Sequence, residues 1–161
     1  MTNSSFSPEV EQQLIEKFDL LLQSLNTFKQ ALDFETETIK TKPASELISS
    51  SEQKQIALSE LEKATANISV QIKPLRIERL LEEPSHYSNN LELLNLIKRC
   101  SERTVECHDQ NLSNGMSIQI LSNINNQMLH MMKGDPNDVK LYGSKGSKQP
   151  QALGKTTLGK A

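Results

Sequence analysis

The sequence predicts an all-α protein built from long helices, and three observations support this prediction. Apolar residues recur at alternating steps of four and three over long stretches, which is the spacing of one helix face. Hydrophobic residues make up 35% of the chain and aromatic residues 4%. This supply is small for a rounded globule, but it suits helices that each bury one narrow stripe. Proline and glycine separate the periodic stretches, as expected at helix ends.

The first helix is predicted from Pro8 to just before Pro43. Ser7 supplies a side-chain oxygen for an unpaired backbone N–H group of the first turn, and Pro43 disfavours helical geometry in the residue before it. The buried stripe, or seam, of this helix is predicted to be Leu14, Phe18, Leu21, Leu25, Phe28, Leu32, Glu35 and Ile39. One charged residue therefore stands in an otherwise apolar seam.

A second helix is predicted to start near Ser45 and to fold back on the first as an antiparallel hairpin, because only about two to five residues separate them. Its seam is predicted to be Leu47, Ser51, Lys54, Leu58, Leu61, Thr65, Ile68 and Ile72. Glu35 lies eight residues before Pro43 and Lys54 lies eleven after it. We therefore expect these two charged seam residues to form a partly buried ion pair.

A short amphipathic helix is predicted over residues 74–83, followed by a loop around Pro84 and a third long helix from about Asn89 to Met132. The seam of the long helix is predicted to be Ile97, Cys100, Thr104, Cys107, Asn111, Asn114, Ile118, Leu121, Asn125, Met128 and Met132. The last residues are too polar to offset the entropy of ordering. The predicted organisation is a flexible N-terminus over 1–7, a helical bundle over 8–140 and a disordered tail over 141–161.

The charge pattern argues against nucleic-acid and membrane functions. The formal net charge is −2, and acidic and basic residues are interspersed along the helical part, so no basic surface for nucleic acid is expected. We find no basic, apolar start typical of a signal peptide and no stretch apolar enough for direct membrane insertion. These features indicate a cytoplasmic protein.

No catalytic, metal or cofactor site is predicted. The three histidines lack the spacing of metal ligands. Cys100 and Cys107 lie about 10 Å apart along one helix, which is too far for a disulfide. No nucleophile, base and orienting group can be named together, so we expect a protein that binds and does not catalyse.

The end of the third helix carries a wide apolar stripe. Its members are Ile118, Ile120, Leu121, Ile124, Met128, Leu129, Met131 and Met132. One alternative is that the stripe is core, and we expect Ile118, Leu121 and Met128 to pack on the hairpin. The other is that its outer part stays exposed and binds a partner, because the stripe covers more than one helix face and methionine adapts to different surfaces.

Three motifs resemble those of the FlgN family of flagellar export chaperones. Residues 111–115 read Asn-Leu-Ser-Asn-Gly and resemble that family's Asn-x-x-Asn-Gly signature. Residues 141–146 begin Leu-Tyr-Gly and end in Gly, like its Leu-Tyr-Gly-x-x-Gly element. Residues 32–35 and 54–61 resemble its hairpin pattern, including the charged seam residues. The resemblance extends over roughly residues 14 to 147.

The resemblance implies an all-helical chaperone that binds hook-associated proteins, which form the hook–filament junction. It also implies delivery to the cytoplasmic domain of the export-gate membrane protein, with substrate bound by the C-terminal helix and the gate contacted through Tyr142. The candidate substrate-binding residues are Met116, where the family often has an aromatic residue, Ile120, Leu121, Ile124, Met128, Leu129 and Met132. The candidate gate-docking residues are Leu141, Tyr142 and Gly143.

A structural coiled-coil adaptor or oligomerisation subunit with no export role is the alternative. Such a protein is expected to have a seam that is apolar throughout and to form a stable higher oligomer. The polar seam positions, among them Lys54 and Asn114, argue against a permanent filament because buried polar groups lower stability while they fix register.

Overall fold

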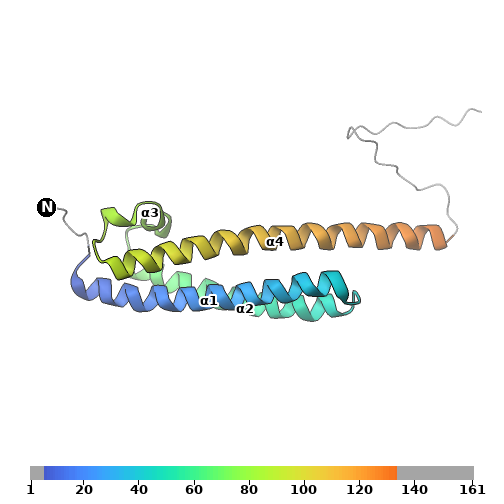
Figure 1. Ribbon diagram of the computed structural model, residues 1–161, viewed down its shortest axis with the longest axis horizontal. Helices are drawn as coiled ribbons and strands as arrows, with labels where there is room; N and C mark the ends of the chain where they lie inside the picture. The colour runs from blue at the N-terminus through green and yellow to red at the C-terminus, as the bar shows by residue number, and fades with distance from the viewer. Residues whose placement is uncertain (1–5, 134–161) are drawn as a thin grey trace, which may run out of the picture. The chain divides into compact units, whose positions relative to one another are not determined.

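The computed structural model describes residues 6–133 of the chain, and every regular element in that range is helical. In chain order the elements are α1 (Pro8–Thr41), α2 (Glu46–Gln71), α3 (Ile77–Glu82), the short 3-10 helix η1 (Pro84–His86) and α4 (Leu91–Met132), as Figure 1 shows. The predicted all-α class is confirmed. Most of the predicted flexible N-terminus and the whole predicted tail lie outside the described residues.

The chain divides into two units, residues 1–121 and residues 122–161. The first unit holds α1, α2, α3, η1 and most of α4. The second unit is described over residues 122–133, which are the end of α4 and one residue beyond it. Each unit is treated by itself below.

In the first unit, α1 and α2 form the predicted antiparallel hairpin. The backbone N–H of Val10 donates to Oγ of Ser7, which caps the start of α1 as expected. Gln71 near the end of α2 donates to Gln13 near the start of α1 at 2.7 Å. Lys54 in the first half of α2 pairs with Glu35 in the last part of α1 at 2.8 Å. The two helices therefore run in opposite directions along their shared length.

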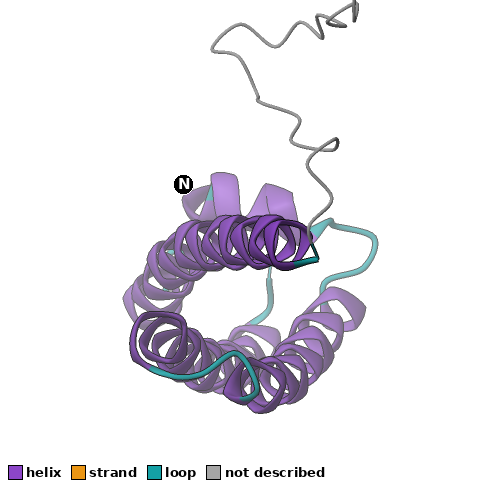
Figure 2. Cartoon of the chain, turned by 90° about the vertical axis from the view of Figure 1, so that its right-hand side faces the viewer, coloured by secondary structure: helices purple, strands orange, loops and turns teal. Residues whose placement is uncertain are grey.

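Helix α4 of the first unit runs parallel to α1, and a ladder of side-chain donors holds the two in register. The Cys100 thiol donates to the Phe18 carbonyl, the Cys107 thiol to the Leu25 carbonyl and the Asn114 amide to the Leu32 carbonyl. In each pair the two residues are 82 positions apart. Because the donors recur every seven residues, they lie on one face of α4. Figure 2 shows α1, α2 and α4 viewed along their length.

The loop before α4 ties its start to the start of α1. The carboxylate of Glu11 in α1 accepts a hydrogen bond from the buried Ser88 hydroxyl, which also accepts from the Asn90 backbone N–H. Asn90 in turn accepts from the backbone N–H groups of Glu92 and Leu93, so it caps α4. This anchoring places the first turn of α4 beside the first turns of α1.

The apolar core of the first unit is concentrated where α1 begins. The main cluster is Leu14, Ile15, Phe18, Leu21, Leu22, Leu25, Ile68, Ile72, Leu80, Leu93, Leu96, Ile97 and Cys100. A smaller cluster follows along the bundle: Phe28, Ala31, Leu32, Ala57 and Cys107. All members of the predicted α1 seam are buried except Ile39, which is half-buried.

The observed α2 seam differs from the predicted one. Ser50 and Ala57 are buried, whereas Ser51 is exposed and Leu58 is only half-buried. Small side chains let α2 approach α1 closely, because the distance between helix axes depends on the residues at the contact. The prediction followed steps of four and three from Leu47 and therefore took Ser51 and Leu58, whereas the buried residues Ser50 and Ala57 lie one position earlier.

Two further predictions need correction. Thr104 and Asn111 were placed in the α4 seam, but both are exposed. The Thr104 hydroxyl bonds to the Cys100 carbonyl of its own helix at 2.8 Å. In addition, the short helix is shorter than predicted, and η1 forms where a loop was expected.

Candidate protein-binding segment of α4

A buried polar cluster joins α4 to the hairpin in the first unit. Glu35 is 1% exposed, and its carboxylate accepts from the Lys54 ammonium at 2.8 Å and from the Asn114 amide at 3.0 Å. The same Asn114 amide donates to the Leu32 carbonyl at 3.1 Å. The predicted ion pair between Glu35 and Lys54 is confirmed, and Asn114 of the Asn-x-x-Asn-Gly motif joins it.

A second layer of polar contacts extends this cluster toward the surface. The Thr36 hydroxyl donates to the Asn114 side-chain oxygen at 2.8 Å, and Gln110 donates to both Thr36 and Asp33 at 2.9 Å. Hydrogen bonds from Lys29 and from Gln110 lower the pKa of the Asp33 carboxyl below its ordinary value. Since every buried side-chain polar atom of residues 6–133 has a partner, the cluster is fully satisfied.

The candidate site begins directly after this cluster. We define the C-terminal segment as residues 116–132 of α4. In the first unit it contributes Met116, Ile118, Ile120 and Leu121; of these only Ile118 is half-buried, and the others are exposed. Leu121 was expected to be core, but it is 38% exposed. Three candidate binding residues, Met116, Ile120 and Leu121, therefore lie on the surface of the first unit.

In the second unit every described side chain is exposed. Five large apolar residues stand among them: Ile124, Met128, Leu129, Met131 and Met132. Met128 was expected to be core, and its exposure of 57% contradicts that expectation. Such side chains are normally removed from water, so a run of them on one helix is typical of a surface that another protein covers.

One exposed apolar residue escaped the sequence prediction. Leu112 is 58% exposed and lies one helical turn before Met116, which lies one turn before Ile120. Spacing by four residues places all three on one face of α4. This i, i+4 spacing was the available signal, but Leu112 was read only as part of the Asn-x-x-Asn-Gly motif.

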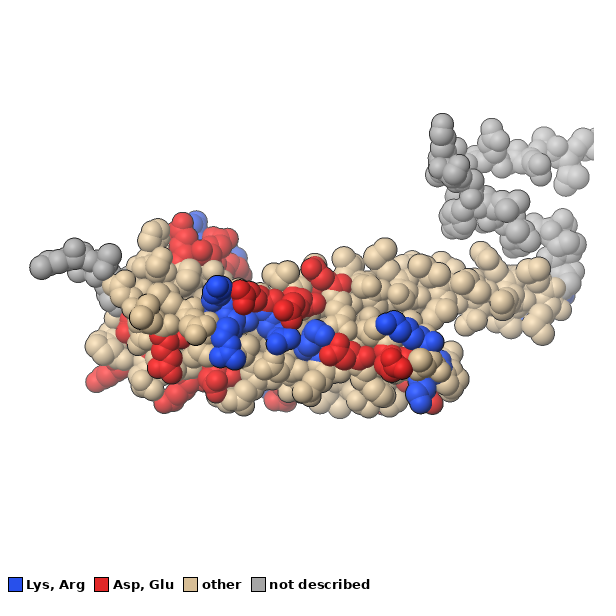
Figure 3. All heavy atoms as spheres, viewed as in Figure 1, with Lys and Arg blue, Asp and Glu red and all other residues tan. Residues whose placement is uncertain are grey.

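The C-terminal segment also differs from the rest of the helical chain in charge. No Asp, Glu, Lys or Arg occurs from Gln110 to Met132. In Figure 3 the red and blue atoms of the visible face lie on the hairpin, on α3 and on the first part of α4, and the later part of α4 is tan. The segment therefore offers apolar contacts and neutral hydrogen bonds, but no ion pairs.

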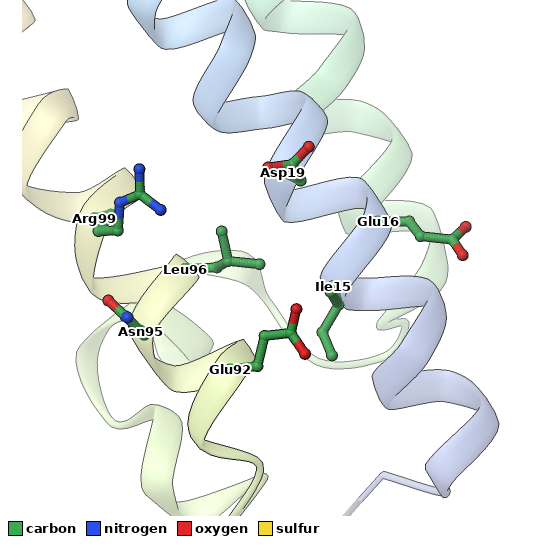
Figure 4. Close-up of a pocket in the computed structure, with 7 residues that line it drawn as sticks. All are labelled: Ile15, Glu16, Asp19, Glu92, Asn95, Leu96 and Arg99. Atoms are coloured by element: carbon green, nitrogen blue, oxygen red, sulfur yellow. The ribbon is translucent and has the colours of Figure 1, made fainter.

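An open cleft lies between α1 and α4 in the first unit. Ile15, Leu96, Arg99 and three carboxylates, Glu16, Asp19 and Glu92, line it together with Asn95. In Figure 4 Leu96 points toward α1, whereas Glu16 points away from the cleft. The carboxylates do not converge on a common point, which a site for acid–base chemistry or a cation requires.

The cysteines and histidines give no sign of reactive chemistry. Burial raises the pKa of the Cys100 thiol to about 11 and also raises the pKa of Cys107. Both thiols are free, as predicted, and act as donors in the ladder to α1. Within residues 6–133, no three His, Cys, Asp or Glu side chains are grouped so that they could hold a metal ion.

Comparison with models of protein families shows which family this chain belongs to. The model of the family described as FlgN protein matches residues 6–150, which include every described helix and the Leu-Tyr-Gly element. This chain belongs to the FlgN family. FlgN proteins are flagellar export chaperones, so the expected family and the expected general role agree with the match. A search of curated proteins and a search of solved structures give no match.

The family match assigns no role to a single residue of this FlgN protein. Met116, Ile120, Leu121, Ile124, Met128, Leu129 and Met132 are exposed on one helix, as binding requires. The proposed gate-docking residues Leu141, Tyr142 and Gly143 lie outside the described residues. None of the helices in the described part of this FlgN protein combines the length and hydropathy needed to cross a membrane.

Proposed function

We propose that this FlgN protein binds hook-associated proteins in the cytoplasm through the C-terminal segment of α4 and delivers them to the type III export gate. The observation that carries the proposal is the exposure of the segment, because every described side chain from Gln119 onward is exposed. Seven of these side chains are large and apolar: Ile120, Leu121, Ile124, Met128, Leu129, Met131 and Met132. The family match supports the general role as a chaperone of flagellar export.

The physical argument is that export substrates must be kept from aggregating before secretion. An unfolded or partly folded terminus exposes apolar side chains, and it can form an amphipathic helix against an apolar helix face. The four methionines of the segment, Met116, Met128, Met131 and Met132, are flexible and polarisable, so they can adapt to more than one substrate.

We further propose that the protein acts by binding alone, without a cofactor or a catalytic step. The buried polar side chains of the described residues all have hydrogen-bond partners within the protein: Glu35 and Asn114 bond to each other, Thr38 and Ser50 bond to carbonyls of their own helices, and Ser88 bonds to Glu11. The carboxylates of the cleft between α1 and α4 do not converge. Tyr142, on the Leu-Tyr-Gly element, is the proposed contact to the cytoplasmic domain of the export gate, since a tyrosine is a strong anchor at a protein interface.

The test is to measure complex mass. The purified full chain is mixed with hook-associated proteins, and light scattering after size exclusion gives the mass of each species. We expect a defined complex with a hook-associated protein and none with the filament protein used as a control. A stable higher oligomer of the chain alone, with no hook-associated protein bound, would contradict the proposal and favour the structural coiled-coil alternative.

A further inference from the structure

We infer that the C-terminal segment selects a partner helix without charged side chains beside its apolar face, and with Asn, Gln or Ser in those positions. The inference concerns the chemistry of the substrate helix, and it rests on the proposed function for the place where that helix binds. It starts from the contrast between the charged bundle and the uncharged segment, visible in Figure 3.

The polar positions of the segment are mostly amides. Gln119, Asn123, Asn125, Asn126 and Gln127 are all exposed. Within the part of the chain that the structure describes, their side chains form no hydrogen bond, whereas the Asn114 and Gln110 amides are engaged with α1. Each amide has two N–H donors and an acceptor oxygen. These groups are therefore free to bond to water or to an incoming partner.

The amides lie beside the apolar contact row. Ile124 and Met128 of the second unit follow each other at a step of four residues, so they form a row along one face of α4. Asn123 and Gln127 form a second row with the same spacing next to it. A partner helix that packs its apolar side chains on the first row brings its flanking side chains against the second row.

Neutral and charged flanking side chains of a partner helix differ in the interactions that they can form with the row of Asn123 and Gln127. An Asn or Gln of the partner can exchange hydrogen bonds with water for hydrogen bonds with Asn123 and Gln127. A Lys or Glu in the same position loses part of its hydration and finds no opposite charge between Gln110 and Met132. The surface thus discriminates against charge of either sign, because neither sign is compensated.

A second copy of this chain is the competing occupant, because its own C-terminal segment has the same neutral chemistry. We favour another protein, since the FlgN family consists of chaperones for flagellar proteins. A self-associated segment would leave no surface for such a substrate. The experiment below separates the two occupants.

The experiment uses the full chain and three designed helical peptides with one common apolar face. The flanking positions carry Asn and Gln in the first peptide, Glu in the second and Lys in the third. Affinities are measured by titration calorimetry at pH 8 between about 50 mM and about 500 mM NaCl, a range over which the screening length falls severalfold. We expect the neutral peptide to bind about tenfold more tightly than either charged peptide. We also expect its affinity to change by less than about twofold with salt.

A charge variant and a matched control locate the effect. Asn123→Lys with Gln127→Lys should make the Glu peptide the preferred ligand and should make its binding salt-dependent. Gln12→Lys with Gln30→Lys adds the same charge to exposed positions of α1 and should keep the wild-type order of the three peptides. Retention of the wild-type order by the Asn123/Gln127 variant would overturn the inference.

The remaining outcomes distinguish this inference from the proposed function. Wild-type preference for one charged peptide overturns the inference, even if hook-associated proteins bind. Failure of hook-associated proteins to bind, with the neutral peptide still preferred, contradicts the proposed function and leaves the chemical preference standing. A dimer of the free chain that dissociates only when Ile124 and Met128 are replaced, and that excludes all three peptides, identifies a second copy as the occupant and overturns the inference.

Discussion

The Asn114 amide donates to the Leu32 carbonyl at 3.1 Å, across the same 82-residue separation that joins Cys107 to Leu25 and Cys100 to Phe18. These three contacts fix the parallel register of α4 on α1. The Asn114 amide also donates to the Glu35 carboxylate, so the ladder ends at the buried ion pair of the hairpin. Beyond this point α4 continues as the uncharged C-terminal segment.

The first prediction concerns Asn114. Asn114→Ala removes the donor to Leu32 and one of the two donors to Glu35, so we expect a loss of about 1–3 kcal/mol in the free energy of unfolding. Urea denaturation followed by circular dichroism measures the loss. Ser117→Ala is the control, because the Ser117 hydroxyl bonds only to the Ser113 carbonyl of its own helix. Equal stability of the Asn114→Ala variant and the wild type would mean that the ladder does not hold α4.

The second prediction concerns the ion pair. Glu35 is buried and Lys54 keeps 23% of its side-chain exposure. Lys54→Ala leaves a buried carboxylate with only the Asn114 amide, which should lower stability by about 1–3 kcal/mol. Removing both charges should be less destabilising than the sum of the single losses. Strict additivity of Glu35→Ala and Lys54→Ala in the double-mutant cycle would rule out the coupling.

The third prediction is a loss of stability at alkaline pH. The Cys100 thiol has a pKa of about 11 in the folded chain against an ordinary value of 9.0, because it is buried. Between these two values the unfolded chain releases the proton while the folded chain retains it, so the stability falls as the pH rises. The loss due to Cys100 should reach about 2–3 kcal/mol.

The control for this titration is Cys100→Ser. A serine hydroxyl can still donate to the Phe18 carbonyl, but it does not titrate in this range. Urea denaturation of both proteins at pH 8 and pH 10.5 gives the difference due to Cys100, since Cys107 and the other groups are common to both. A wild-type stability that falls no more steeply than that of Cys100→Ser would contradict the assigned pKa.

How far the sequence predicts this fold depends on the size of the seam residues. The α1 seam was predicted correctly from Leu14 to Glu35 because each position carries a large residue or a conspicuous charge. The α2 seam was predicted only in part. Ser50 and Ala57 are buried although neither is a large apolar residue, and their small size lets the two helices approach each other closely. The donor ladder could not be predicted, since thiol-to-carbonyl contacts depend on which helix lies opposite and in which direction it runs.

The candidate site was predicted in part. The family motifs and the width of the stripe located the C-terminal segment, and the structure places its candidate residues on the surface. Helical periodicity alone assigned Leu121 and Met128 to the core, because it cannot tell a face that meets another helix from one that meets water. The lack of charged residues from Gln110 to Met132 is visible in the sequence, but it points to a neutral binding surface only when the segment is known to be exposed.

The fourth prediction separates gate docking from substrate binding. If Tyr142 anchors the export gate, Tyr142→Ala should leave thermal stability and substrate affinity unchanged and should weaken binding of the loaded chaperone to the gate by about thirtyfold, which corresponds to about 2 kcal/mol. Titration of the gate's cytoplasmic domain with free and loaded chaperone, wild type and variant, measures this. Equal affinities of loaded wild type and loaded Tyr142→Ala would exclude Tyr142 as the anchor.

The central claim, that the C-terminal segment captures the substrate, is tested most directly by one set of replacements. The variant Leu121→Asn, Ile124→Asn, Met128→Gln and Leu129→Gln changes only exposed side chains, and Ile48→Asn, Ile56→Asn and Val70→Asn make the matched control on exposed positions of α2. Circular dichroism should show unchanged helix content and melting for both proteins. Titration with a hook-associated protein should then show at least about a hundredfold loss of affinity for the segment variant and wild-type affinity for the control. Wild-type affinity of the segment variant, or a loss of binding that comes with loss of the helical bundle, would contradict the account.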